Sequence, residues 1–132
     1  MAHDLRNIPG LPAPESYSHV SIARGARQIH IAGQVGRSPS GALADGLAGQ
    51  AEQALRNVRA ALAEADASPD DLVKLTIYLV DWDVSKFEEL GAGLMAAQAD
   101  GPWPAVPVTA IGVQGLFEPE MLVEIEAVAV AG

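Results

Sequence analysis

Polar and hydrophobic residues alternate in two short runs early in the chain, over residues 17–22 and 28–32. Alternation with a period of two is typical of half-buried strands. The Gly25-Ala26 pair between the runs suits a type II′ turn, which takes glycine at its first central position. We therefore predict a β-hairpin here. Residues 1–16, with three prolines and a glycine, are predicted to form an extended lead-in.

A helical pattern follows Asp45, a residue type favoured at helix N-caps. The apolar residues behind it recur at spacings of three and four, as on the buried face of an amphipathic helix; they are Leu47, Ala51, Ala54, Leu55, Val58, Ala61, Leu62 and Ala65. A second helix is predicted after Asp83, with an apolar face made of Phe87, Leu90 and Leu94. Gly91 and Gly93 weaken that helix by about 1 kcal/mol each relative to alanine.

Three further strands are predicted from runs rich in β-branched residues. They span residues 72–80, 106–114 and 121–130, and a loop rich in Gly, Ser and Pro covers residues 33–46. The order β-β-α-β-α-β-β indicates an α+β fold with a mixed sheet. Two amphipathic helices cover only one face of such a sheet. Because the last strand carries apolar side chains on both faces toward its end, we expect its other face to contact a second copy of the chain.

Length and composition exclude or disfavour several classes of protein. The 132 residues suit a single domain, residues 1–132, and the formal charge of −9 disfavours nucleic acid because acidic surface repels phosphate. No apolar run reaches the roughly 18 residues of a membrane span, and no signal-peptide pattern is present. Without cysteine there are no disulfides and no thiolate nucleophile. We expect a cytoplasmic protein.

The three histidines, His3, His19 and His30, are the first candidates for a metal site. In the predicted hairpin His30 lies opposite Ser21 and diagonal to His19. A zinc site needs three or four ligands, so we expect a polar histidine pair and no metal. Motifs for a serine nucleophile, a phosphate loop or a dinucleotide fold are absent. The two tryptophans, Trp82 and Trp103, are expected to pack in the core or an interface.

Glu124 and Glu126 interrupt the apolar last strand, and no arginine or lysine follows Lys86 to pair with them. Period two places both carboxylates on one face of the strand. One interpretation is a solvated face. The other is that one of them faces a cleft between subunits, where it could activate a water molecule.

Three segments together resemble the RidA/YjgF family, the reactive intermediate deaminases: AGQVG at 32–36, the stretch over 50–81, and LVEIEAVAV at 122–130. They occur in the family's order over most of the chain from Tyr17 onward. The resemblance implies a chorismate-mutase-like fold and a homotrimer with small-molecule clefts between subunits. It also implies hydrolysis of carboxylate-bearing imines or enamines to a keto acid and ammonia, with no cofactor.

The resemblance also assigns site residues by position. Tyr17 matches a tyrosine that lines the cleft, Ala32 and Gly33 match a serine-glycine pair, and Glu124 matches the glutamate that places or activates water. Family deaminases grip the substrate carboxylate with an arginine in a P-A-R-[ST] stretch, through a bidentate pair. This chain has PAVPVT there, and its last arginine is Arg59.

Val108 stands at the arginine position, or Val106 if the alignment shifts by two residues. We assign Val108 and Thr109 to ligand contact and leave open whether Arg37, in its loop, replaces the lost clamp. Without a bidentate clamp the usual imino acids are poor ligands. We predict a protein that hydrolyses or tautomerises a neutral imine, enamine or carbonyl compound with Glu124.

Two alternatives remain. The chain could be a non-catalytic small-molecule-binding or regulatory module that keeps the cleft without the chemistry, so whether it is an enzyme is open. A ribonuclease activity, attached to some relatives, is disfavoured by the net charge and the missing arginine.

Overall fold

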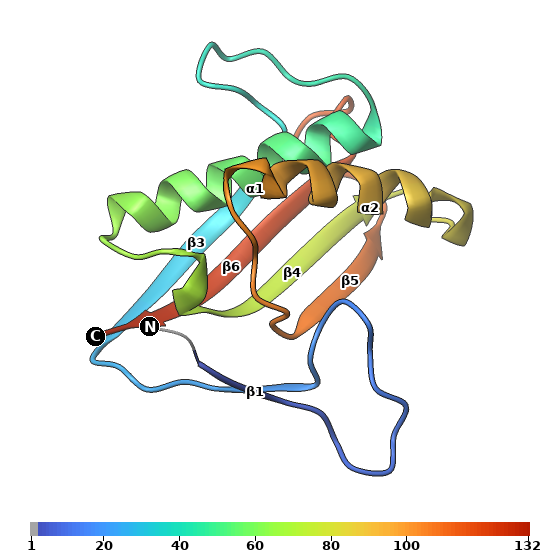
Figure 1. Cartoon of the computed structure of the whole chain (residues 1–132). Coiled ribbons are helices and arrows are strands. Elements are labelled where there is room, and N and C mark those ends of the chain that lie inside the picture. Colours follow the sequence, from blue (N-terminus) through green and yellow to red (C-terminus); the bar gives the residue numbers. More distant parts are fainter. Residues whose placement is uncertain (1–2) are drawn as a thin grey trace.

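The structure is a computed structural model that describes residues 3–132. A four-stranded sheet forms one layer and both long helices lie on the same face of it, as Figure 1 shows. The elements in chain order are β1 (Asp4–Arg6), β2 (Val20–Ile22), β3 (Arg27–Val35), α1 (Gly46–Glu64), β4 (Leu72–Val80), α2 (Phe87–Ala96), β5 (Val108–Val113) and β6 (Val123–Ala131). The predicted α+β class with helices on one face is confirmed.

The main sheet has the order β3-β6-β4-β5. Strand β6 is antiparallel to both of its neighbours, whereas β4 and β5 run parallel. Every second residue of β6 from Val123 to Ala131 is buried on the helix side, and those from Val123 to Ala129 belong to one core with Leu62 of α1. The limits of β4, β5 and β6 differ from the predicted ones by at most two residues, and β3 extends three residues beyond its predicted end, which is within the usual uncertainty of strand ends read from a pattern.

Helix α1 buries the predicted apolar stripe, including Leu55, Val58 and Leu62. Asp45 is the N-cap residue, as predicted, but its side chain makes no capping hydrogen bond. Instead, the Leu47 backbone N–H donates to the Glu89 carboxylate of α2, at 3.2 Å. The second helix therefore satisfies an orphan donor at the start of the first.

Helix α2 departs from prediction in two respects. Phe87 was expected on its buried face with Leu90, but the Phe87 side chain is 63% exposed and Leu90 is 5% exposed. Asp83 caps the short 3-10 turn Val84–Lys86, accepting a bond from the Ser85 backbone N–H, so Phe87 becomes the first residue of α2. Gly93 faces α1, where a Cβ would lie 2.2 Å from the Ala48 carbonyl oxygen. This glycine permits a close helix crossing.

The predicted hairpin between residues 17–22 and 28–32 is wrong. Strand β2 pairs with β1, and β3 pairs with β6, in two separate sheets. Alternation of polar and apolar residues predicts a strand but not the strand with which it pairs. In the structure β3 forms seven residue pairs with β6. At Gly25 the chain passes so close to the C-terminal strand that a Cβ would lie 2.4 Å from the Ala131 carbonyl oxygen, which directs β3 onto β6.

The lead-in over residues 1–16 also contains a strand that the prediction missed. β1 pairs in register with β2, Leu5 opposite Ser21, and the Leu5 side chain packs partly against the core. The His3 ring lies 2.9 Å from the Val130 carbonyl oxygen and 3.0 Å from that of Asp71. These contacts attach the N-terminal arm to one end of the main sheet.

Candidate functional site

The sheet face opposite the helices carries polar residues of two neighbouring strands. On β6 these are Glu124 and Glu126, and on β4 they are Lys74, Thr76 and Tyr78; their neighbours in sequence point into the core. We call this surface the open face. Both glutamates lie on it, as period two predicts.

A β-bulge in β3 shapes the open face next to these carboxylates. Ile31 pairs with Ala127 and Gln34 with Ile125, so Ala32 and Gly33 together oppose the single residue Glu126. Bulges bend a strand and redirect its side chains, and they are over-represented next to active sites. The pair that the resemblance assigned to the cleft is therefore the bulge itself.

Glu124 and Gly33 lie in close contact. A Cβ on Gly33 would be 2.5 Å from the Glu124 carboxylate oxygen Oε2 and equally close to its Cδ. A larger residue at position 33 would require the Glu124 side chain to move, so the glycine lets the carboxylate lie against the bulge. Two residues that the sequence assigned to one site, 91 positions apart, are thus neighbours.

Beside this contact the open face is hollowed, with a volume of about 500 Å³. The hollow is lined by His30, Ile31 and Ala32 from β3, by Lys74 and Thr76 from β4, and by Glu126, Ala127 and Val128 from β6. Tyr78 Oη donates to Glu126 Oε1 at 2.5 Å. This bond raises the pKa of the Tyr78 phenol, because losing its proton would set two negative charges side by side.

The sequence prediction missed Lys74, Thr76 and Tyr78 as site candidates. Their signal was present, since polar and apolar residues alternate over 72–80 and imply a polar face. The interpretation as a strand was correct, but the polar side of that strand was not followed to the face it shares with the two glutamates.

The structure separates the remaining predicted site residues. Val108 is half-buried against the core and pairs with Leu75, on the helix side of the sheet. Val106 is 1% exposed. Thr109 lies on the open face, where it accepts a hydrogen bond from Lys74 Nζ at 2.5 Å.

Tyr17 lies on the N-terminal arm, 41% exposed, with its ring edge-on to His19 at 6.4 Å between centroids. His19 accepts from the Ile8 backbone N–H at 2.9 Å, whereas His30 lies on β3 opposite Val128. The predicted pairing of these two histidines is therefore wrong, because His19 directly precedes β2, which belongs to a different sheet from β3. Within residues 3–132 no three histidine, aspartate or glutamate side chains are arranged to hold a metal ion.

Arg37 does not approach Glu124 through any hydrogen bond or ion pair that the described chain forms. Its guanidinium pairs with Glu118 and donates to the Gly41 carbonyl oxygen at 2.7 Å. These contacts connect the loop before α1 to the loop before β6.

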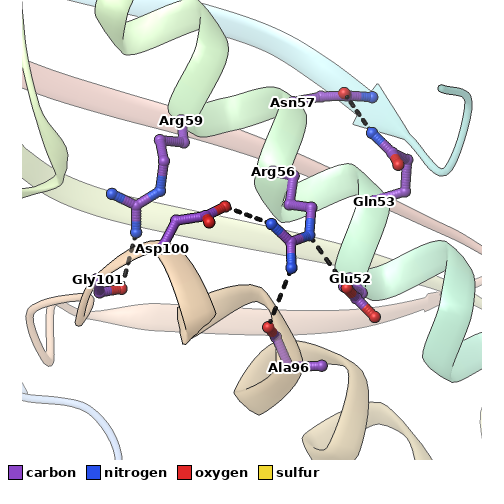
Figure 2. A network of polar contacts seen from close by, with 8 residues as sticks. All are labelled: Glu52, Gln53, Arg56, Asn57, Arg59, Ala96, Asp100 and Gly101. Carbon is purple, nitrogen blue, oxygen red and sulfur yellow. Dashed lines mark hydrogen bonds and ion pairs between the residues drawn. The ribbon is translucent and has the colours of Figure 1, made fainter. Parts of the chain in front are cut away.

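Two arginines of α1 hold the segment that leads into β5, as Figure 2 shows. Arg56 pairs with Glu52 and Asp100, and Arg59 donates to the Gly101 carbonyl oxygen at 2.8 Å. The Arg59 guanidinium also stacks over the Trp103 ring, 4.9 Å from its centroid. Trp103 thus packs, as predicted, and it fixes the approach to the PAV segment where the family's arginine would stand.

The helices of residues 3–132 include none that is long and apolar enough to cross a membrane.

Comparison with known proteins agrees with this arrangement. A family profile described as "Endoribonuclease L-PSP" matches residues 10–131. A RutC family protein from Aquifex aeolicus (strain VF5) is 38% identical over 84 residues, which cover 62% of this chain and 64% of that protein. The alignment therefore spans less than two thirds of that relative's length.

Solved structures match over nearly the whole chain. YyfB from Yersinia pestis, a protein of unknown function of the conserved Rid family, is 32% identical with a TM-score of 0.82, covering 98% of this chain and 99% of that one. RidA from an Antarctic Psychrobacter is 31% identical with a TM-score of 0.66, covering 89% and 93%. The bulge, the open face and the helix layer described above thus belong to a member of the Endoribonuclease L-PSP family, and within it to the RidA/YjgF proteins.

Proposed function

We propose that the chain forms a homotrimer that binds a small metabolite in clefts between its copies, with Glu124 as the acid–base or water-positioning group. The observation that carries this proposal is the Gly33–Glu124 contact, which keeps a carboxylate beside a backbone bulge on a face without helices. A carboxylate positioned in this way can take a proton from water and return it to a leaving group.

The reaction that suits one carboxylate and no cofactor is hydrolysis of an imine. Glu124 accepts a proton as water adds to the C=N carbon, forming the C–O bond while the nitrogen gains a proton. The carbinolamine then loses ammonia, its C–N bond breaks, and the carbonyl forms. The balance is one imine and one water to one carbonyl compound and one ammonia.

The substrate is expected to be neutral rather than an imino acid. No arginine follows Arg59 in the chain, and both candidate positions for the family's clamp are valines. A charge-assisted contact contributes about 1.5–3 kcal/mol, and a carboxylate would lose it here. An uncharged imine or enamine loses nothing.

The open face supports assembly from several copies. Val128 and Val130 of β6 lie on it beside the glutamates, and Ile111 of β5 is 40% exposed there. Apolar side chains on an uncovered sheet face favour burial against another chain. Trimer formation would give Glu124 a cleft wall from a neighbouring copy.

A non-catalytic module that binds a metabolite is the second candidate. The specific observation in its favour is the missing arginine, since a carboxylate alone places water but does not hold a substrate at it.

Rates of ammonia release from two imines, one with and one without a carboxylate, distinguish the enzyme from the non-catalytic module. We expect the full chain to release ammonia from an N-unsubstituted ketimine without a carboxylate, and barely to accelerate hydrolysis of iminopyruvate. Glu124→Gln is nearly isosteric and should lower the ketimine rate by about 100-fold or more, the usual share of a general base. Glu88→Gln, an exposed glutamate on α2, serves as the matched control and should leave the rate unchanged.

Iminopyruvate hydrolysis that is rapid and indifferent to Glu124→Gln would contradict the site. Binding of the ketimine's ketone product without any turnover would favour the non-catalytic module.

A further inference from the structure

We infer that His19 is a pH-sensitive closure of the N-terminal arm: it holds the loop over residues 8–18 closed while its ring is neutral and releases that loop when the ring takes a proton. This goes beyond the proposed function, because it concerns the arm of residues 3–22 and neither Glu124 nor the open face. The His19 side chain is half-buried and stands where the paired strands β1 and β2 end.

Side chains replace the backbone ladder at the end of this strand pair. The last backbone pair is Arg6 with Val20, and the register places Asn7 opposite His19. The His19 backbone N–H donates to Asn7 Oδ1 at 3.0 Å, and the Ile8 backbone N–H donates to His19 Nδ1 at 2.9 Å. We call these two hydrogen bonds the clasp. They close the loop at its base.

The direction of the Ile8 bond fixes the protonation of the His19 ring. A backbone N–H only donates, so Nδ1 accepts through its lone pair and carries no hydrogen. The neutral ring therefore holds its hydrogen on Nε2. In the imidazolium form both ring nitrogens carry hydrogens, and the Nδ1 hydrogen would point at the Ile8 N–H. Protonation thus replaces a hydrogen bond by two facing donors, and the clasp opens on that side.

No acidic partner offsets this loss. The Tyr17 ring lies edge-on to the His19 ring, with 6.4 Å between centroids. Among residues 3–132 no carboxylate forms an ion pair with His19, and Asp4 and Arg6 of β1 pair with each other. The titratable groups of the arm, and of β4 where it packs against β2, are His3, Asp4, Arg6, Glu15, Tyr17 and Lys74.

Little else holds the loop closed. Within it, as far as the structure describes the chain, the backbone hydrogen bond is a long one, from the Leu11 N–H to the Ile8 carbonyl oxygen at 3.3 Å. The three prolines of the loop have no N–H to donate. The side chains of Ile8 and Leu11 are 46% and 53% exposed, so they add little packing that would keep the loop in place.

Release is confined to the loop. The Ser21 hydroxyl of β2 donates to the Val73 carbonyl oxygen at 2.7 Å, a contact without an imidazole. His3 Nε2 faces two carbonyl oxygens, at 2.9 and 3.0 Å, so it donates in either protonation state. Acid should therefore free Tyr17, at the end of the loop, while the rest of the arm stays attached to the main sheet.

Nuclear magnetic resonance of the full chain in its solution assembly tests the inference between pH 8 and pH 5, where histidine changes its charge. At pH 8 the ring nitrogen shifts of His19 should show a bare Nδ1 and a protonated Nε2. As the ring takes a proton, the Ile8 amide signal should move with the same midpoint. Its protection against hydrogen exchange should fall about fivefold, the value of one net hydrogen bond.

His19→Asn keeps an oxygen at the same number of bonds from the backbone as Nδ1, and it does not titrate in this range. The Ile8 amide should then stay protected at both ends of the pH range. His19→Leu removes the acceptor and should leave the Ile8 amide unprotected at both. His30→Asn changes a histidine on β3, serves as the matched control and should leave the Ile8 titration unchanged.

A hydrogen on His19 Nδ1 at pH 8 would overturn the inference, and so would an Ile8 amide signal that does not follow the ring. The same pH dependence in His19→Asn, or full protection of Ile8 in His19→Leu, would overturn it as well. The first two measurements use the unmutated chain, so they decide the matter where a variant fails to fold.

Discussion

Gly33 and Glu124 show how a site depends on single residues. The resemblance named both, but the reason for the glycine becomes visible only in the structure, where a Cβ would meet the Glu124 carboxylate. A bulge has no signature in the alternation of side chains, because it is defined by the partner strand. The contact could therefore not be derived from residues 28–36 alone.

The Tyr78–Glu126 bond makes a prediction about titration. Hydrogen bonding to the Glu126 carboxylate raises the pKa of the Tyr78 phenol above its ordinary value of about 10. The neutral phenol is the form that donates, so the bond's contribution to stability is complete below pH about 10 and is lost as pH rises through the raised pKa. Phenolate absorbance of a Tyr17→Phe protein reports Tyr78 alone.

Adding Glu126→Gln removes the charge and keeps an acceptor, and the Tyr78 midpoint should fall toward the ordinary value. Unchanged midpoints in the two proteins would show that the bond does not form in solution.

At the scale of elements, the two glycines of α2 should behave oppositely. An alanine Cβ at Gly91 meets nothing within 4 Å, so Gly91→Ala should raise the free energy of unfolding by about 0.5–1 kcal/mol through helix propensity. At Gly93 the Cβ would meet backbone of α1 at Ala48, so Gly93→Ala should lower it by about 1–3 kcal/mol, as overpacking does. Urea unfolding measures both.

Stabilisation by both substitutions would mean that α2 does not cross α1 as closely as described. The sequence alone ranks both glycines as equal helix weakeners, because the crossing is a tertiary contact that no local propensity contains.

Helices and strands could be predicted from the sequence where the spacing of their apolar residues is regular. The strands that pair with one another could not be predicted in this way. The apolar stripe of α1 and the strand over 72–80 were identified with their limits nearly correct. The predicted strand partners were wrong for β2 and β3. Several strands can pair with the same sheet edge, and the partner that forms is the one with the most favourable pairing along its whole length. β1 was missed because prolines follow it closely, and proline-rich stretches read as loops.

For the whole molecule, one face of the sheet lacks helices, and both the Glu124 site and the hollow lie on it. Two helices of this length cover one face only, as the element count already implied. In the proposed assembly another copy covers the other face and supplies the cleft wall opposite Glu124. The function proposed for Glu124 therefore depends on assembly more than on any individual side chain.

Sedimentation equilibrium at micromolar concentration tests this dependence most directly. Three chains of 13.7 kDa amount to about 41 kDa, and the account predicts a species of that mass that persists on dilution. A stable species of 13.7 kDa would remove the cleft between copies and contradict the function assigned to Glu124.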